Sequence, residues 1–234
     1  GSVDHGFLRE HARWMMDAGN AGMIPLGSLG EGNTLDFHEK TAILETLVDA
    51  LGTAPVIPGI ASLSTHGAVQ LAQAARDIGC RGLMVLPPYV YTSDWREMKA
   101  HVATVLAATE LPVILYNNPI AYRTDFLAPQ VAELSAEHPN LRGVKESSGD
   151  SRRVTALRAA LPDTVDILVG LDDMALEGVA AGATGWVAGL VNAYPAESVR
   201  LFELARAGEW AQAQELYRWF LPLLRLDTVN KFVQ

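Results

Sequence analysis

The stretch at residues 141–150, LRGVKESSGD, decides the fold, and it is organised around one lysine. Its first half predicts a short buried strand that ends at Lys145, and its second half predicts a turn and the start of a helix. Burying an ammonium group is costly, so Lys145 is either held in an ion pair or has its pKa lowered for chemistry. In a barrel of parallel strands this end faces the active site, where an uncharged lysine amine can attack a ketone and form a Schiff base.

On both sides of this stretch, short apolar strands alternate with helices of ten to sixteen residues. The strands are continuous and apolar, which is typical of parallel strands buried on both faces. Among the helices, one begins at Asp36, where Asp36 and Glu39 have the spacing of a capping box. We expect two helices to close the chain, near 195–207 and from about 210 into the 220s. The expected strands are 22–27, 55–60, 82–86, 112–116, 141–145, 166–170 and 184–189.

These repeated strand and helix units predict an α/β fold, a TIM (β/α)8 barrel with extra C-terminal helices. Seven strands are expected here, and a barrel of this kind closes with eight. The alternative is an open doubly wound sheet, but the first strand is not followed by a phosphate-binding fingerprint. We therefore expect a single barrel domain over residues 1–234, whose first strand lies before Gly1, with a helical part from about 195 to 234.

Composition excludes several classes of function. The formal net charge is −9 and there is no basic run, which argues against binding to nucleic acid or to an anionic membrane surface. Cys80 is the only cysteine, so an internal disulfide is impossible. No stretch has the length of a membrane span and no signal-peptide pattern is present. A cytoplasmic protein is the expectation.

Polar side chains follow the predicted strands and would gather at the carboxyl rim of a barrel. The loop 27–32, GSLGEG, is either a tight turn or a cradle in which backbone amides and the Ser28 hydroxyl hold a carboxylate. Tyr116 is either a packed aromatic or, beside a Schiff-base lysine, a proton shuttle. The expected rim residues are Ser28, Glu31, Tyr89, Tyr91, Tyr116, Asn117, Lys145, Gly170 and Asn192.

Asp172 and Asp173 resemble a metal-binding pair at first sight. Asp172 is, however, a natural N-cap of the helix that follows, and no histidine has ligand spacing to either residue. We expect neither a metal ion nor another cofactor.

The rim motifs together resemble one known family. The blocks 27–31 (GSLGE), 116–119 (YNNP), 143–146 (GVKE), 170–173 (GLDD) and 182–185 (GATG), with Asn192, have the order and spacing of the dihydrodipicolinate synthase / N-acetylneuraminate lyase family of class I aldolases. The resemblance covers essentially the whole chain. It implies an eightfold barrel assembled as a homotetramer of two dimers, and by the same comparison the chain lacks the first strand and a helical segment after Gln234.

The resemblance also implies roles for individual residues. Lys145 corresponds to the Schiff-base lysine and Tyr116 to the tyrosine that shuttles protons. The hydroxyl and amides that bind the carboxylate of a small 2-oxo or cyclic 2-imino acid correspond to Ser28 and Leu29. The other expected substrate contacts are Gly30, Glu31, Asn117, Gly170 and Asn192.

Three departures from the family pattern bear on the substrate. The synthase has an arginine for its second substrate where this chain has Ala121, although Arg123 is nearby. The family's second tyrosine, which reaches into the neighbouring subunit, falls at Val90, with Tyr91 one residue later. Leu29 stands where synthase and lyase have threonine. Blocks 25–32, 86–91 and 116–119 look more like the branch that deaminates 1-pyrroline-4-hydroxy-2-carboxylate in hydroxyproline degradation.

Two alternatives stay open from the sequence. The chain is a pyruvate-dependent aldolase or a 4-hydroxy-tetrahydrodipicolinate synthase, or it is a non-catalytic barrel that binds a keto acid. Ala121 and Val90 motivate the second alternative, because related enzymes have polar groups at both positions.

Overall fold

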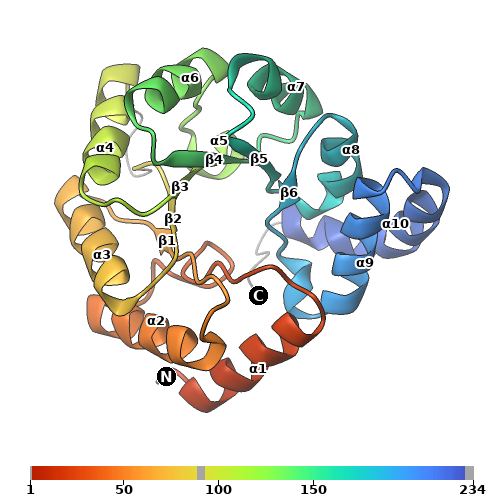
Figure 1. The fold of residues 1–234 in the computed structure, drawn as a ribbon, viewed down its shortest axis with the longest axis horizontal. Helices are drawn as coiled ribbons and strands as arrows, with labels where there is room; N and C mark the ends of the chain where they lie inside the picture. The colour runs from red at the N-terminus through yellow and green to blue at the C-terminus, as the bar shows by residue number, and fades with distance from the viewer. Residues whose placement is uncertain (1, 89–92, 230–234) are drawn as a thin grey trace.

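The computed structural model describes residues 2–88 and 93–229, and a parallel β-sheet lies at its centre. Neighbouring strands in this sheet follow one another in the chain, so each connection crosses over through a helix (Figure 1). This order is that of a barrel built from successive strand and helix units. The strands are β1 (Gly59–Ile60), β2 (Leu83–Val85), β3 (Val113–Asn117), β4 (Leu141–Glu146), β5 (Asp166–Val169) and β6 (Gly185–Trp186).

Helices form a ring around the strands (Figure 1). In chain order these outer helices are α1 (His5–Asp17), α2 (Phe37–Leu51), α3 (Thr65–Ile78), α4 (Trp95–Ala107), α6 (Ala128–Glu137), α7 (Ser151–Ala160) and α8 (Ala175–Ala180). The predicted start of α2 is confirmed: the amide of Glu39 donates to Asp36 at 2.8 Å and the amide of Asp36 donates to Glu39 at 2.9 Å. This reciprocal pairing satisfies amides that the first turn of a helix otherwise leaves without partners.

The predicted strand at 22–27 is much shorter in the structure than expected. Met23 forms a single parallel bridge with Val56, and the amide of Gly59 donates to the carbonyl of Pro25 at 2.8 Å. Pro25 has no amide to donate, and Leu26 adopts a φ of 62°, which ends the extended backbone. The segment therefore runs beside β1 without becoming a full strand.

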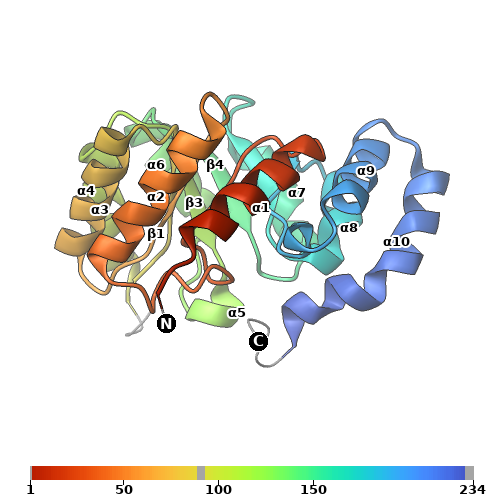
Figure 2. The same ribbon diagram turned by 90° about the horizontal axis from the view of Figure 1, so that it is seen from below.

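The C-terminal helices pack as an addition to the barrel. Helices α9 (Pro195–Arg206) and α10 (Trp210–Leu224) lie against α8 on one side of the ring (Figures 1 and 2). They enclose their own apolar cluster, which includes Leu201, Leu204, Phe220 and Leu224. The predicted C-terminal helical part is confirmed, and its bounds agree closely with those expected.

The described residues also contain three short 3-10 helices: η1 (Asp172–Met174), η2 (Leu190–Asn192) and η3 (Arg225–Thr228). A short helix, α5 (Pro119–Tyr122), follows β3. Figure 2 shows α5 and the end of α10 on the same side of the molecule. Among the described residues, none of the helices is long and apolar enough to cross a membrane.

Candidate active site

Lys145 and Tyr116 lie side by side at the carboxyl ends of β4 and β3, where they are partners in the parallel register. Lys145 is 9% exposed, and its Nζ lies 4.1 Å from the centroid of the Tyr116 ring. Within the described part of the chain, no carboxylate forms a salt bridge with Lys145. The structure therefore does not support the ion-pair alternative for this lysine.

Gly170 makes room for the lysine side chain. Its amide donates to the carbonyl of Glu146 at 2.9 Å, which holds the end of β5 against β4. A Cβ at this position would lie 1.8 Å from Ser147 Oγ and 2.8 Å from Lys145 Cε. Only glycine fits such a close approach. The structure thus places Gly170 against Lys145, and its contact with a substrate stays a prediction.

The hydroxyl of Tyr116 is oriented by Asn118, a residue that the sequence analysis did not single out. Asn118 Nδ2 donates to the Tyr116 hydroxyl at 3.1 Å, and Asn118 Oδ1 accepts from the amide of Ala121 at 3.0 Å. Asn118 is therefore also the N-cap of α5, with Pro119 at the first helical position. The sequence Asn-Pro is a recognisable signal for such a helix start.

Ser28, in the loop at 27–32, is connected to Tyr116 through a third residue, Tyr122. The loop is compact, because the amide of Gly32 donates to the carbonyl of Gly27 at 3.2 Å. Ser28 Oγ forms a hydrogen bond with the hydroxyl of Tyr122, at the end of α5. Tyr122 in turn packs edge-on against Tyr116, with ring centroids 5.8 Å apart. The sequence analysis predicted Ser28 and Tyr116 but missed the tyrosine between them.

The next three residues of this loop, 29–31, are all exposed. Leu29 is 39% exposed, and its Cδ1 lies 2.4 Å from the place where a Cβ on Gly189 would be. Gly30 and Glu31 are exposed, and Glu31 has a φ of 51°. Their predicted contacts with a substrate stay predictions.

Asn117 lies in the scaffold behind the site. Successive side chains of a strand alternate in direction, so Asn117 points away from the face that Tyr116 occupies. Its Nδ2 donates to Glu146 at 3.0 Å and to Asp125 at 3.2 Å, and its Oδ1 accepts from the amide of Phe126 at 2.9 Å. These contacts hold Asn117 among scaffold residues, and its contact with a substrate stays a prediction.

Asn192 lies in η2 and is exposed. Its Nδ2 donates to the carbonyl of Gly189 at 3.0 Å, and its Oδ1 lies 3.3 Å from His11 Nε2. The structure does not bring Asn192 into contact with Lys145 or Tyr116, and its role in binding stays a prediction.

The expectation that Asp172 caps a helix is wrong. Leu171 precedes η1, and the buried carboxylate of Asp172 accepts from Trp186 Nε1 at 3.1 Å and from the amides of Gly189 and Leu190 at 2.9 and 2.6 Å. It therefore fixes the loop that follows β6. Burial raises the pKa of Asp172 to about 6, the charge of Asp227 adds to this, and the hydrogen bonds oppose it.

A second carboxylate, that of Asp227 in the C-terminal segment, lies beside Asp172. It lies in η3, and its Oδ2 accepts from the amide of Asp172 at 3.3 Å. Burial raises the pKa of Asp227, while the hydrogen bond from Asp172 and the charge of Lys145 lower it. Asp227 is thus within electrostatic reach of Lys145.

Ala121 lies within α5 and Arg123 directly follows it, and both are exposed. Ala121 offers no polar group, and Arg123 adopts a φ of 55° after the last residue of the helix. Tyr89, Val90 and Tyr91 lie outside the described residues.

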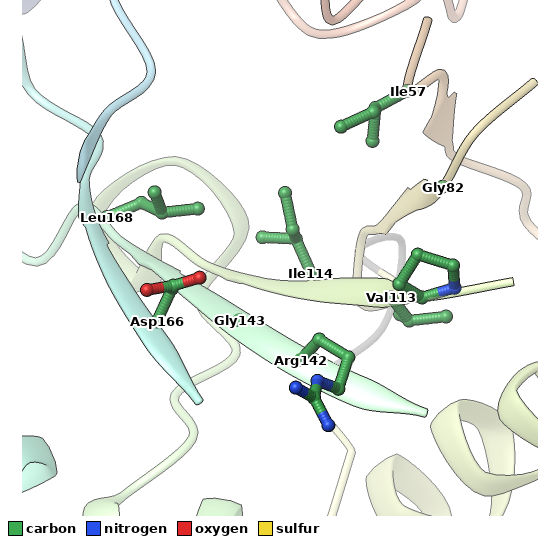
Figure 3. Close-up of a pocket in the computed structure, with 9 residues that line it drawn as sticks. Ile57, Gly82, Val113, Ile114, Arg142, Gly143, Asp166 and Leu168 are labelled. Atoms are coloured by element: carbon green, nitrogen blue, oxygen red, sulfur yellow. The ribbon is translucent and has the colours of Figure 1, made fainter. Parts of the chain in front are cut away.

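The amino end of the barrel contains a cavity with a volume of about 170 Å³ (Figure 3). The side chains of Ile57, Ile114 and Leu168 converge on it from three strands or strand ends. Arg142 and Asp166, at its rim, are exposed. This cavity is lined by apolar groups and lies at the opposite ends of the strands from Lys145.

Comparisons with known proteins identify the family and the fold of this chain. The sequence model of the dihydrodipicolinate synthetase family matches residues 1–234. The 4-hydroxy-tetrahydrodipicolinate synthase of Natronomonas pharaonis is 35% identical over 215 residues, which are 92% of this chain and 73% of the relative.

Two solved structures extend the comparison to the fold. The 4-hydroxy-tetrahydrodipicolinate synthase of Methylacidiphilum fumariolicum SolV has a TM-score of 0.95 at 28% identity, covering 98% of this chain and 77% of that one. The dihydrodipicolinate synthase of Acinetobacter baumannii in complex with pyruvate has a TM-score of 0.93 at 28% identity, covering 99% and 79%. The predicted (β/α)8-barrel class is confirmed.

Proposed function

Because this chain belongs to the dihydrodipicolinate synthetase family of class I aldolase-type lyases, we propose that it forms a Schiff base between Lys145 and a small 2-oxo or cyclic 2-imino acid. One observation carries this proposal: Lys145 is buried at the end of a barrel strand, with its amine 4.1 Å from the centre of the Tyr116 ring. A buried amine beside a phenol is the arrangement that nucleophilic attack and proton transfer both require.

The chemistry assigns each group a step. The uncharged Nζ of Lys145 attacks the keto carbon of a 2-oxo acid, and a C–N bond forms while the carbonyl oxygen takes up a proton. Loss of that oxygen as water, which needs a second proton, gives the Schiff base. The Tyr116 hydroxyl, held by Asn118, is the group placed to pass these protons. Ser28 and the amides of its loop bind the substrate carboxylate, which fixes the keto carbon in front of the amine.

The names of the relatives support a synthase that condenses pyruvate with a second substrate. The Natronomonas pharaonis relative is named 4-hydroxy-tetrahydrodipicolinate synthase, and the Acinetobacter baumannii enzyme was solved with pyruvate. Pyruvate is accordingly the first 2-oxo acid to test with this chain.

A specific observation favours a second candidate, the deamination of 1-pyrroline-4-hydroxy-2-carboxylate. Ala121 offers only a methyl group where the synthase pattern has an arginine for the second substrate's carboxylate, and the exposed Arg123 follows α5 instead. A reaction with one substrate has no need of that arginine. In this reaction the enzyme opens the ring with the net uptake of one water molecule and releases ammonia and 2-oxoglutarate semialdehyde.

A product assay separates the two candidates. The protein is incubated with 1-pyrroline-4-hydroxy-2-carboxylate, or with pyruvate and an aldehyde, while ammonia release and pyruvate consumption are followed. Ammonia release identifies the deaminase, and pyruvate consumption that depends on the aldehyde identifies the condensing enzyme. If no product forms with any 2-oxo or imino acid, the proposed activity is wrong, and a thermal shift with pyruvate without an adduct would identify a binding protein.

Two further expectations belong with this proposal. A homotetramer built from two dimers is implied by the family resemblance, and sedimentation of the purified protein tests it. A cytoplasmic location stays a prediction.

A further inference from the structure

Tyr122 contacts both Tyr116 and Ser28, although it belongs to none of the motifs that indicated the function. It is 9% exposed, and it packs with Tyr116, Met84 and Leu86 in one apolar cluster. Its ring meets that of Tyr116 at an angle of 86°, so that the edge of one ring faces the other. Its hydroxyl forms a hydrogen bond with the Ser28 side chain, in the loop at 27–32.

The position of Tyr122 is set by the same residue that orients Tyr116. Asn118 caps α5 with its side chain, and its carbonyl accepts from the amide of Tyr122 at 3.0 Å. The same Asn118 side chain donates to the Tyr116 hydroxyl at 3.1 Å. Asn118 therefore fixes the two phenols relative to each other, and one of them is bonded to Ser28.

Two hydroxyl groups share one hydrogen bond, so only one of them donates. A phenol is the stronger donor of the two, because it gives up its proton far more readily than an aliphatic alcohol does. When Tyr122 donates to Ser28 Oγ, the hydroxyl hydrogen of Ser28 is left to point at a third group. If Ser28 donated to Tyr122 instead, a lone pair of Ser28 Oγ would face the third group. A lone pair at this place repels a carboxylate.

We propose that Tyr122 is a positioning residue that makes the Ser28 hydroxyl a donor toward the carboxylate of the substrate. The inference rests on the proposed function, since it takes Lys145 as the nucleophile and Ser28 as a carboxylate ligand. It deepens that function by assigning a source of selectivity: the site prefers 2-oxo acids to uncharged ketones because Tyr122 fixes the direction of one hydroxyl.

The experiment compares two ligands that differ in the carboxylate. Reductive trapping with borohydride is followed by intact mass over a range of pyruvate concentrations, and separately over a range of hydroxyacetone, an uncharged ketone. Tyr122→Phe keeps the ring and removes the hydroxyl. It should raise the pyruvate concentration for half-maximal trapping roughly tenfold or more, the effect of a weakened hydrogen bond to a charged group. Trapping of hydroxyacetone and the maximal trapping rate with pyruvate should stay close to those of the unmodified protein.

Three further variants make the result specific. Ser28→Ala should weaken pyruvate trapping at least as much as Tyr122→Phe, and the double variant should be no weaker than Ser28→Ala alone, because the tyrosine acts through the serine. Tyr194→Phe is the matched control, since Tyr194 is 37% exposed and packs edge-on against Phe220 in the C-terminal helices. It should leave trapping of both ligands unchanged.

The outcomes distinguish the inference from the function on which it rests. If the unmodified protein traps neither ligand on Lys145, the proposed Schiff base with a 2-oxo acid fails, and the inference fails with it. If it traps pyruvate but Tyr122→Phe weakens both ligands equally, or neither, the inference is wrong and Tyr122 is only packing. Should Tyr122→Phe fail to fold, Ser28→Ala still decides: an unchanged preference for pyruvate over hydroxyacetone in that variant overturns the inference.

Discussion

The two ends of the barrel differ in the side chains that converge there. At the amino end, a cavity of about 170 Å³ is lined by Ile57, Ile114 and Leu168, and its charged neighbours are exposed (Figure 3). At the carboxyl end, Lys145 and Tyr116 are both buried and are in contact. The residues that line the amino-end cavity include no lysine or tyrosine. Volume alone is therefore a poor guide to the active site, and buried polar groups that converge are a better one.

The difference follows from the direction of the strands. In parallel strands of a barrel, all carboxyl ends meet at one face, and the loops that follow them carry polar side chains to that face. Along β4 the inward positions change from Gly143, beside the amino-end cavity, to Lys145, at the other end. The same strand thus contributes to both ends, and substitutions along it can separate their roles.

The largest expected effect is at Tyr116. Tyr116→Phe removes the hydroxyl that passes protons and keeps the ring against Lys145, so turnover should fall by about two to four orders of magnitude. Trapping of the Schiff base should still occur. Steady-state kinetics with the substrate identified by the product assay, together with intact mass, check this prediction. Unchanged turnover would show that the proton comes from another group.

A pair of glycine substitutions should separate the two ends next. In Gly170→Ala the new Cβ would overlap Ser147 Oγ and lie 2.8 Å from Lys145 Cε. Displacing the nucleophile by about 1 Å should slow adduct formation roughly a hundredfold. In Gly143→Ala the nearest atom is Ile114 Cγ1 at 3.3 Å, in a side chain that can turn into the amino-end cavity.

Gly143→Ala should therefore retain adduct formation within a few-fold of the unmodified protein. The rate of mass increase with pyruvate and borohydride measures both variants. Equal losses in the two variants would contradict the assignment of chemistry to the carboxyl end.

The smallest expected effect concerns Asp172 and is measured as a change in stability with pH. The pKa of its carboxyl group is raised from 3.8 to about 6 in the folded protein, so the folded state holds this proton more tightly than the unfolded chain does. Its contribution to stability is therefore fully present below about pH 4 and is lost as the pH rises through about 6. Asp172→Asn should lack this contribution, so the melting temperature of the unmodified protein should gain a few degrees relative to the variant between pH 7 and pH 4.

Asp163→Asn, which removes a carboxylate that lies in solvent, serves as the control and should follow the unmodified protein. Parallel melting curves for Asp172→Asn and the unmodified protein across this pH range would show that burial does not affect the Asp172 carboxyl group.

Much of the fold could be predicted from the sequence, because its signals are local. Continuous apolar strands indicated a parallel sheet, and the capping box at Asp36 and Glu39 marked the start of α2 within one residue. The adjacency of Tyr116 and Lys145 also followed, since consecutive strands of such a barrel are neighbours. The strand at 22–27 was overestimated, because the positive φ of Leu26 is set by the packing of its loop and has no glycine to signal it.

The rest of the site depends on contacts between distant segments. Tyr122 reaches Ser28 across 94 positions in the chain, and this contact exists only because Asn118 starts a four-residue helix directly after β3. Asp227 reaches the amide of Asp172 because the segment after α10 returns to the barrel, which no local pattern specifies. Asp172 has the composition of a helix cap, and its true partners lie 14 to 18 residues further along the chain.

The most direct test of the central claim is intact mass after borohydride reduction with pyruvate, comparing the unmodified protein with Lys145→Ala. We expect the unmodified protein to gain the mass of one reduced pyruvyl group per chain and the variant to gain none. Gly143→Ala, two residues earlier on the same strand, should gain the same mass as the unmodified protein. An adduct that persists in Lys145→Ala would contradict the assignment of Lys145 as the nucleophile.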